Sequence, residues 1–218
     1  MVTDQRQGRR PWLVGVTGAS GTPYAAALLR GLLAASRPVD LVVSRAARLT
    51  LRDEAGLTWR DDLPSLRRWL ETPLDDTLPS LPAEPWDVRI WKVTDLAAPP
   101  SSGSYLTHGM VVIPASTASI AAIATGLSRD LLQRAADVTL KERRLLVVVP
   151  RETPLTGITL RQLATLADLG VAVVPAAPAF YSKPKSVQQL VDFIAGKVLD
   201  LLGVEHELFA RWTGQLGG

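Results

Sequence analysis

Short apolar runs rich in valine alternate with longer stretches of helical periodicity along most of this chain, and this alternation limits the fold more than any other feature. Continuous apolar strands are typical of a sheet that is buried on both faces, whose parallel strands are joined by crossover helices. We expect strands at residues 12–17, 39–44, 88–93, 110–114, 145–149 and 171–174, and helices at residues 23–36, 45–56, 116–126, 130–142, 159–170 and 186–203. The pattern predicts an open parallel α/β sheet with helices in layers around it.

The chain has the size of one compact domain, because its 218 residues are 47% hydrophobic and can bury a substantial core. We expect a single domain over residues 1–218, with a core at 11–56 and 87–203 and a C-terminal tail at 204–218 that closes the ligand site. Residues 57–86 carry clustered turn signals and are expected to form an insertion. Leu63, Leu66, Trp69 and Leu70 have helical spacing there, which indicates either a short helix docked on the body, or a lid or subunit contact.

Several classes of function are disfavoured by composition. The chain has no cysteine and only two histidines, His108 and His206, which lie far apart, so we expect no metal site. The polar, basic N-terminus lacks a signal-peptide pattern, which favours a cytoplasmic location, and the apolar stretch at 111–127 is too interrupted to span a membrane. The net charge of +3 comes without a basic stripe interleaved with aromatic residues, so we expect phosphate groups of a small ligand and no nucleic acid.

Two segments that follow predicted strands offer backbone N–H groups and hydroxyls at the start of a helix. The sequence GVTGASGTPYA follows the first strand, and its glycines and helix start suit a phosphate, although a turn merely capped by Ser20 remains an alternative. It matches neither the dinucleotide fingerprint nor the Gly-Lys-Ser/Thr phosphate loop. The segment 116–119 is a second such helix start, for which simple helix capping is again the alternative.

Charged and aromatic residues gather after the later strands. Arg151 and Glu152 directly follow the apolar run LLVVV, where the ligand-binding edge of an open sheet lies. Glu152 is a candidate for proton transfer and Arg151 for phosphate binding, unless the two only pair with each other. The loop at 178–185 adds Tyr181, while Arg134 and Lys141 lie seven residues apart on one cationic helix face that could also be solvated surface.

Four segments together resemble one known family, the UbiX-type flavin prenyltransferases, formerly labelled phenylacrylic acid or 3-octaprenyl-4-hydroxybenzoate decarboxylases. They are GVTGASG, SGSYLTHGMVVIPAS, TGLSRDLLQRAADVTLKERRLLVVVPRETPL and PAFYSKPKSVQQLVDFIAGKVLDLLGV. The resemblance runs from about residue 12 to 212, without 57–86. It implies a flavodoxin-like or Rossmann-like three-layer fold in a homododecamer, with FMN bound between subunits.

The resemblance also implies a reaction and its residues. A dimethylallyl group from dimethylallyl phosphate would be joined to N5 and C6 of reduced FMN without a metal, and the prenylated FMN would serve a UbiD-type decarboxylase. Glu152, Lys141, Ser20 and Arg151 would be catalytic. The resemblance assigns FMN binding to Gly18, Ala19, Ser20, Ser44, Ser116, Thr117, Ala118, Ser119 and Arg134, and prenyl-donor binding to Tyr181, Lys197, Lys141, Arg151, Glu152, Glu54 and Trp212.

The main departure from the family pattern is at Lys197, and two rival functions remain to be weighed. Lys197 stands where the family commonly has arginine, which keeps the charge and loses the bidentate fork. An FMN-dependent decarboxylase of the peptidyl-cysteine type is disfavoured because the chain lacks a PxMNxxMW segment. A non-catalytic FMN carrier is disfavoured because it would need neither Glu152 nor Tyr181 at the flavin.

Overall fold

A six-stranded parallel sheet forms the centre of the computed structural model, which describes residues 9–76, 80–212 and 214. Its strands are β1 (Trp12–Val16), β2 (Val39–Val43), β3 (Val88–Trp91), β4 (Gly109–Ala115), β5 (Leu145–Pro150) and β6 (Ala172–Val173). They lie in the order β3-β2-β1-β4-β5-β6, and each neighbouring pair is parallel. The predicted open parallel α/β sheet is therefore confirmed.

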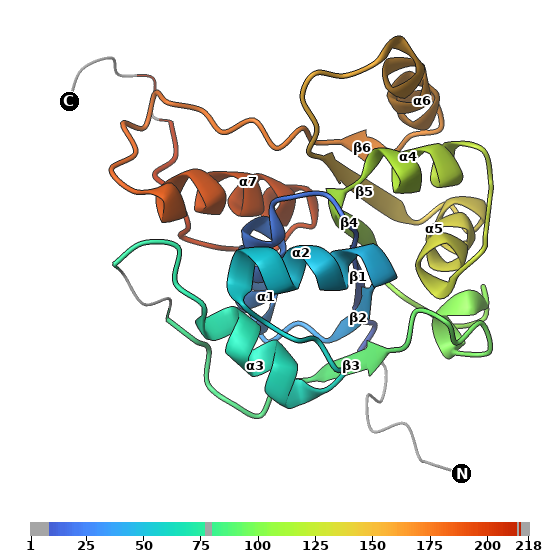
Figure 1. The fold of residues 1–218 in the computed structure, drawn as a ribbon, viewed down its shortest axis with the longest axis horizontal. Coiled ribbons are helices and arrows are strands. Elements are labelled where there is room, and N and C mark those ends of the chain that lie inside the picture. Colours follow the sequence, from blue (N-terminus) through green and yellow to red (C-terminus); the bar gives the residue numbers. More distant parts are fainter. Residues whose placement is uncertain (1–8, 77–79, 213, 215–218) are drawn as a thin grey trace.

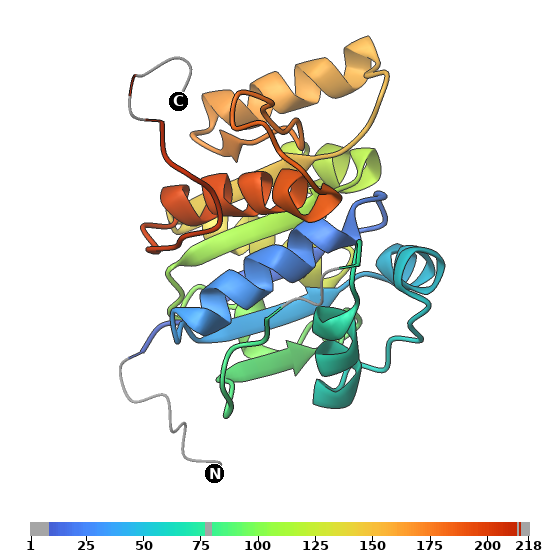
Figure 2. The ribbon, with the colours of Figure 1, turned by 90° about the vertical axis from the view of Figure 1, so that its left-hand side faces the viewer.

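Helices cover both faces of this sheet (Figures 1 and 2). They are α1 (Thr22–Ala34), α2 (Arg45–Ala55), α3 (Leu63–Glu71), α4 (Thr117–Ala124), α5 (Leu131–Lys141), α6 (Gly157–Asp168) and α7 (Val187–Leu201), with a short 3-10 turn, η1 (Pro99–Ser101). Helices α1 and α7 pack together on one face, while α4, α5 and α6 lie on the other. The helices predicted from the sequence are all present, and their ends differ by only a few residues.

Burial on both faces explains why the strands read as continuous apolar runs. In β1, Val14 and Val16 belong to the core cluster under α1 and α7, whereas Leu13 belongs to the cluster under α4 and α5. All five residues of β1 and all seven of β4 are buried. Since side chains alternate between the faces of a strand, a strand at the centre of a three-layer fold needs apolar residues at every position.

Residues 57–86 contain helix α3, which is docked on the body of the domain. Leu66, Trp69 and Leu70 are buried in the core cluster shared with α1, and Trp59 meets Trp69 edge to face at a centroid distance of 5.9 Å. Asp62 caps the helix by accepting a hydrogen bond from Ser65 N at 2.8 Å. The helical spacing seen in the sequence thus corresponds to a buried face, except at the exposed Leu63.

Parts of three predicted segments lie outside the described residues. These are the basic residues 1–8, residues 77–79 of the expected insertion, and residues 213 and 215–218 of the expected closing tail. In the described part of the chain, no helix is long and apolar enough to cross a bilayer.

Candidate functional site

A cleft of about 520 Å³ opens at the carboxyl edge of the sheet, where β1 and β4 lie side by side. The chain leaves β1 for a helix on one face and β4 for a helix on the other, and ligands of open α/β sheets bind at such a switch point. The residues that line it are Gly18, Ser44, Arg45, Ala46, Val93, Thr94, Ser116, Ala118, Ser119, Arg129, Asp130 and Gln133.

Three helices begin at this cleft, each with a capped N-terminus. Ser44 Oγ accepts from Ala47 N at 3.1 Å, Ser116 Oγ from Ser119 N at 3.3 Å, and Asp130 Oδ1 from Gln133 N at 2.9 Å. These caps leave other backbone N–H groups of the first turns free to face the cleft, and the dipoles of α2, α4 and α5 favour an anion there. Arg45 and Arg129 add positive charge at the rim.

A buried hydroxyl that the sequence analysis did not single out holds the two central strands together at the cleft. Thr17 Oγ1 donates to Pro114 O and accepts from Ser116 N, both at 2.7 Å, and its side chain is buried. Thr17 therefore fixes the position of Ser116 relative to the end of β1. The signal in the sequence was a polar residue placed directly between an apolar strand and a glycine.

Gly18 is required by the close approach of α2 to the loop after β1. A Cβ atom at this position would overlap the Cβ of Ala46. The absence of a side chain lets the backbone of the loop and the start of α2 form one continuous wall of the cleft. Volume, free N–H groups, hydroxyls and cations together fit a phosphorylated planar ligand such as FMN.

Glu54 occupies the N-terminus of α1, the position at which the glycine-rich sequence after β1 predicts a phosphate as one alternative. Its carboxylate accepts from Gly21 N at 2.9 Å, from Thr22 N at 2.8 Å and from Thr22 Oγ1 at 2.7 Å. Burial raises the pKa of Glu54, but hydrogen bonds from Thr22, Ser20 and Gly21 outweigh this effect and lower it. This carboxylate thus takes up N–H groups at the start of α1, so the helix starts that face the cleft and could bind an anion are those of α2, α4 and α5.

Arg151 and Glu152 follow β5 at the same edge of the sheet, but they face different partners. Arg151 Nε donates to Ser20 O at 2.8 Å, which joins the loop after β5 to the loop after β1. Glu152 Oε1 accepts from Thr153 N at 3.1 Å and is exposed. Burial raises the pKa of the neighbouring Tyr24, an effect that the charge of Arg151 opposes.

The aromatic residues predicted for the prenyl donor come together at the C-terminal end of the chain. The Tyr181 ring lies edge to face with Trp212 at 5.8 Å and with Phe193 of α7 at 6.0 Å. Lys197 Nζ, also on α7, lies 3.9 Å from Asp200 Oδ2, and Arg211 Nη2 binds the other oxygen of the same carboxylate at 2.8 Å. Both rings are about half exposed, at 52% for Tyr181 and 55% for Trp212.

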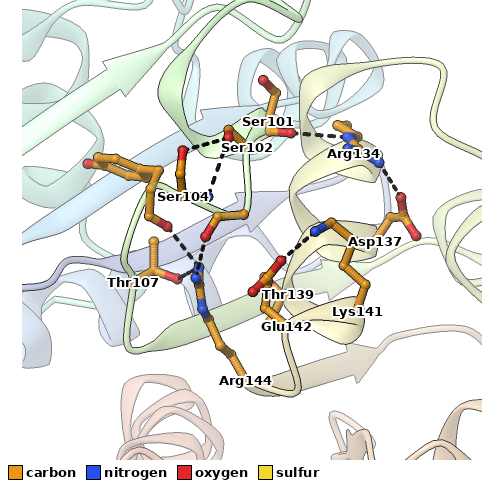
Figure 3. A network of polar contacts seen from close by, with 12 residues as sticks. Ser101, Ser102, Ser104, Thr107, Arg134, Asp137, Thr139, Lys141, Glu142 and Arg144 are labelled. Carbon is orange, nitrogen blue, oxygen red and sulfur yellow. Dashed lines mark hydrogen bonds and ion pairs between the residues drawn. The ribbon is translucent and has the colours of Figure 1, made fainter.

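Arg134 and Lys141, both on α5, are predicted site residues that lie outside the lining of the cleft. Figure 3 shows Arg134 Nη1 bound to Asp137 Oδ2 at 2.6 Å, with its Nε donating to Ser101 O at 3.1 Å, and Lys141 paired with Glu142. Helix α5 runs antiparallel to the strands, so Lys141 at its end lies at the amino edge of the sheet. Arg151 lies at the carboxyl edge, and the six residues of β5 that separate the edges span about 20 Å.

The remaining predicted residues lie beside the cleft. Ala19 is buried within the loop after β1, Ser20 is exposed in the same loop, and Thr117 is the first residue of α4. Arg45, Arg129 and Gln133 line the cleft without having been assigned to it from the sequence. Among residues 9–76 and 80–212, no group of three or more histidine, aspartate or glutamate side chains is placed to hold a metal ion.

The fold and the cleft define an α/β flavoprotein, and a model of the Flavoprotein family matches residues 2–199 of the chain. Among curated relatives, Flavin prenyltransferase UbiX of Streptomyces coelicolor is 61% identical over 210 residues, which is 95% of this chain and 97% of the relative. The UbiX protein of Pseudomonas aeruginosa is 39% identical over 202 residues, 93% of either chain. This chain belongs to the flavin prenyltransferase UbiX family.

Solved structures of UbiX proteins have the same fold as this chain. A crystal structure of AnUbiX in complex with FMN and dimethylallyl pyrophosphate has a TM-score of 0.80 and 36% identity, over 95% of this chain and 99% of that chain. A dodecameric FMN-dependent UbiX-like decarboxylase from Escherichia coli O157:H7 has a TM-score of 0.78 and 37% identity, over 94% and 100% of the two chains. The flavodoxin-like three-layer fold implied by the resemblance is therefore confirmed.

Proposed function

We propose that this protein is a flavin prenyltransferase, which joins the dimethylallyl group of dimethylallyl phosphate to N5 and C6 of reduced FMN. Reduced FMN supplies the nucleophilic ring atoms, and the prenylated FMN formed is a cofactor for a UbiD-type decarboxylase. The observation that carries the proposal is the cleft at the β1–β4 switch point, where three helix N-termini and two arginines converge in a member of this family.

In this proposal the FMN phosphate is held at the helix starts. Hydroxyls of Ser44, Ser116 and Ser119 and the backbone beside Gly18 face the cleft. Thr17 holds the loop after β1 and the loop after β4 in a fixed position relative to each other. Arg151 stays bound to Ser20 O through Nε, which leaves its terminal nitrogens for a phosphate oxygen. The Glu152 carboxylate is placed beside it to move a proton at Oε1 or Oε2.

Departure of phosphate is the step for which the protein provides charge. Lys141, Arg151 and Lys197 are cations that would stabilise the leaving group, and the Tyr181 and Trp212 rings would shelter an allylic cation from water. In one chain Lys141 and Arg151 lie at opposite edges of the sheet, so the proposal requires Lys141 from another copy. A homododecamer with the site between subunits provides this arrangement, and a relative of this chain is dodecameric.

The first experiment is incubation of the purified protein with reduced FMN and dimethylallyl monophosphate in metal-free buffer, followed by mass spectrometry of the extracted flavin. We expect the flavin to gain one C5H8 unit. Glu152→Gln and oxidised FMN should abolish the gain, whereas Asp168→Asn, which neutralises an exposed carboxylate at the end of α6, should not. Unmodified flavin that stays bound would refute the transferase and favour the carrier or a decarboxylase.

Mixed oligomers test whether the site is shared. Lys141→Ala and Glu152→Gln subunits, each inactive alone, are expressed together with different tags and purified through both. If the two residues come from different copies, random assembly restores both to about a quarter of the sites and activity returns. If both residues serve the site of their own chain, the mixture stays inactive.

A cytoplasmic location and transfer of the product to a UbiD-type decarboxylase stay parts of the prediction.

A further inference from the structure

The loop at residues 101–107, which we call the serine loop, is bound along its length by one arginine. Arg144, just before β5, donates from Nη2 to Gly103 O at 2.7 Å and from Nη1 to Tyr105 O at 2.8 Å and Thr107 Oγ1 at 3.3 Å (Figure 3). These acceptors are backbone carbonyls and a hydroxyl, so the guanidinium acts as a clamp that fixes the course of the backbone.

Two further contacts fix the serine loop from its other sides. Tyr105 Oη donates to Asp40 Oδ2 at 2.7 Å, and Asp40 is fully buried in β2. At the start of the loop, Ser101 O accepts from Arg134 Nε at 3.1 Å. The loop is therefore bound to the sheet through Asp40, to the first turns of α5 through Arg134, and to the segment between α5 and β5 through Arg144.

Gly103 lies at the point where the serine loop meets the end of α5. A Cβ atom at Gly103 would lie 2.8 Å from Lys141 Nζ and would overlap the carboxylate of Glu142. These atoms are the far ends of flexible side chains. An alanine here would therefore displace the side chains of Lys141 and Glu142 and leave the course of the backbone unchanged. A hydrogen bond from Lys141 lowers the pKa of Glu142, which keeps the pair charged.

We propose that Gly103 and Arg144 are positioning residues for Lys141: Arg144 holds the serine loop in place, and Gly103 leaves the space in which the ammonium group lies. The Lys141 side chain is half exposed, and the loop beside its ammonium group limits the rotamers that it can adopt, which reduces the entropy lost when the ammonium group binds a phosphate. This inference rests on the proposed function, because it gives Lys141 the role of binding the prenyl phosphate.

The test compares Gly103→Ala and Arg144→Ala with Arg143→Asn. Arg143 is exposed and adjacent, so Arg143→Asn removes the same charge, and its positive φ of 54° is one that asparagine tolerates. We expect the KM for dimethylallyl monophosphate to rise about tenfold in the first two variants, as for loss of one well-placed charged contact. The affinity for FMN, measured by quenching of flavin fluorescence, should stay within about twofold of wild type in all three, since the clamp lies outside the cleft.

A double-mutant cycle separates positioning from general damage. If Gly103 acts through Lys141, Gly103→Ala adds nothing to the dissociation constant of Lys141→Ala for dimethylallyl monophosphate, measured by titration calorimetry because Lys141→Ala is inactive, whereas independent effects would multiply. Effects that multiply, or an unchanged KM in Gly103→Ala, would overturn the positioning role. The proposed function would still stand in that case, provided that the wild-type protein prenylates FMN. If wild-type protein leaves the flavin unmodified, both the function and this role of Lys141 fall. Should Arg144→Ala not fold, the Gly103→Ala cycle decides alone.

Discussion

The carboxylate of Glu54 gives the most quantitative prediction. It comes from the last turn of α2 and accepts hydrogen bonds from two backbone N–H groups and one hydroxyl at the start of α1. It therefore ties together the helices that follow β1 and β2 and fixes the turn that carries Ser20. The variant Glu54→Gln keeps the shape and one acceptor oxygen but loses the charge.

The magnitude follows from the bonds that change. A hydrogen bond to a charged group contributes about 1.5–3 kcal/mol, and a carboxylate at a helix N-terminus adds about 0.3–1 kcal/mol. Glutamine retains part of the first contribution and little of the second, so we expect Glu54→Gln to lower the free energy of unfolding by about 2 kcal/mol at pH 7. Asp53→Asn removes a neighbouring exposed carboxylate of the same helix and should change it by less than about 0.5 kcal/mol.

The assay is urea unfolding followed by circular dichroism at one fixed protein concentration, because assembly would couple to stability. The pKa of Glu54 in the folded protein is lowered, so its contribution is complete above the unfolded value of about 4.3 and is lost as the pH falls through the folded value. The difference between wild type and Glu54→Gln should therefore shrink on acidification below about pH 5. A difference that stays the same from pH 7 to pH 3, or equal effects of Glu54→Gln and Asp53→Asn, would refute the reasoning.

Three further substitutions test other parts of the structure. Thr17→Val should lower the free energy of unfolding by about 1–3 kcal/mol, because it leaves Ser116 N–H unpaired. An unchanged free energy in urea unfolding would contradict the stabilising role of the hydrogen bonds that Thr17 makes to Pro114 and Ser116. Trp69→Ala should cost about 3–5 kcal/mol in the same measurement, since the ring is buried in the core; a smaller loss, as for a surface residue, would mean that α3 is only loosely docked. Gly18→Ala should weaken FMN binding at least about tenfold in a fluorescence titration, because the new methyl group pushes α2 away from the cleft, and unchanged affinity would show that this wall does not touch the flavin.

The fold could be predicted from the sequence because its signal is local and repeated. Each central strand is apolar at every position, and each helix begins at a side-chain cap or glycine that the sequence displays. The order β3-β2-β1-β4-β5-β6 could not be read in the same way, since the residues of a buried parallel strand do not specify which strand lies beside it. That order decides which loops meet, and it brings Gly18, Ser44 and Ser116 into one cleft.

The site was less accessible to sequence reasoning where a side chain acts far from its place in the chain. Glu54 reaches backbone groups 32 and 33 residues away, and Thr17 bridges to residues 97 and 99 positions further on. Their residue types carry no mark of these partners, because a carboxylate on a helix and a hydroxyl after a strand are common in any α/β protein. Only packing of the loops against each other determines these bonds.

Lys141 and Glu152, which the proposed function uses together, lie at opposite edges of the sheet within one copy. A crossover helix returns the chain to the amino edge of the sheet before each new strand begins, so residues at the end of α5 and at the end of β5 must lie about one strand length apart. No rotamer of lysine spans that distance. If one site uses both Lys141 and Glu152, as we propose, it can form only between copies, and assembly is then a condition for activity.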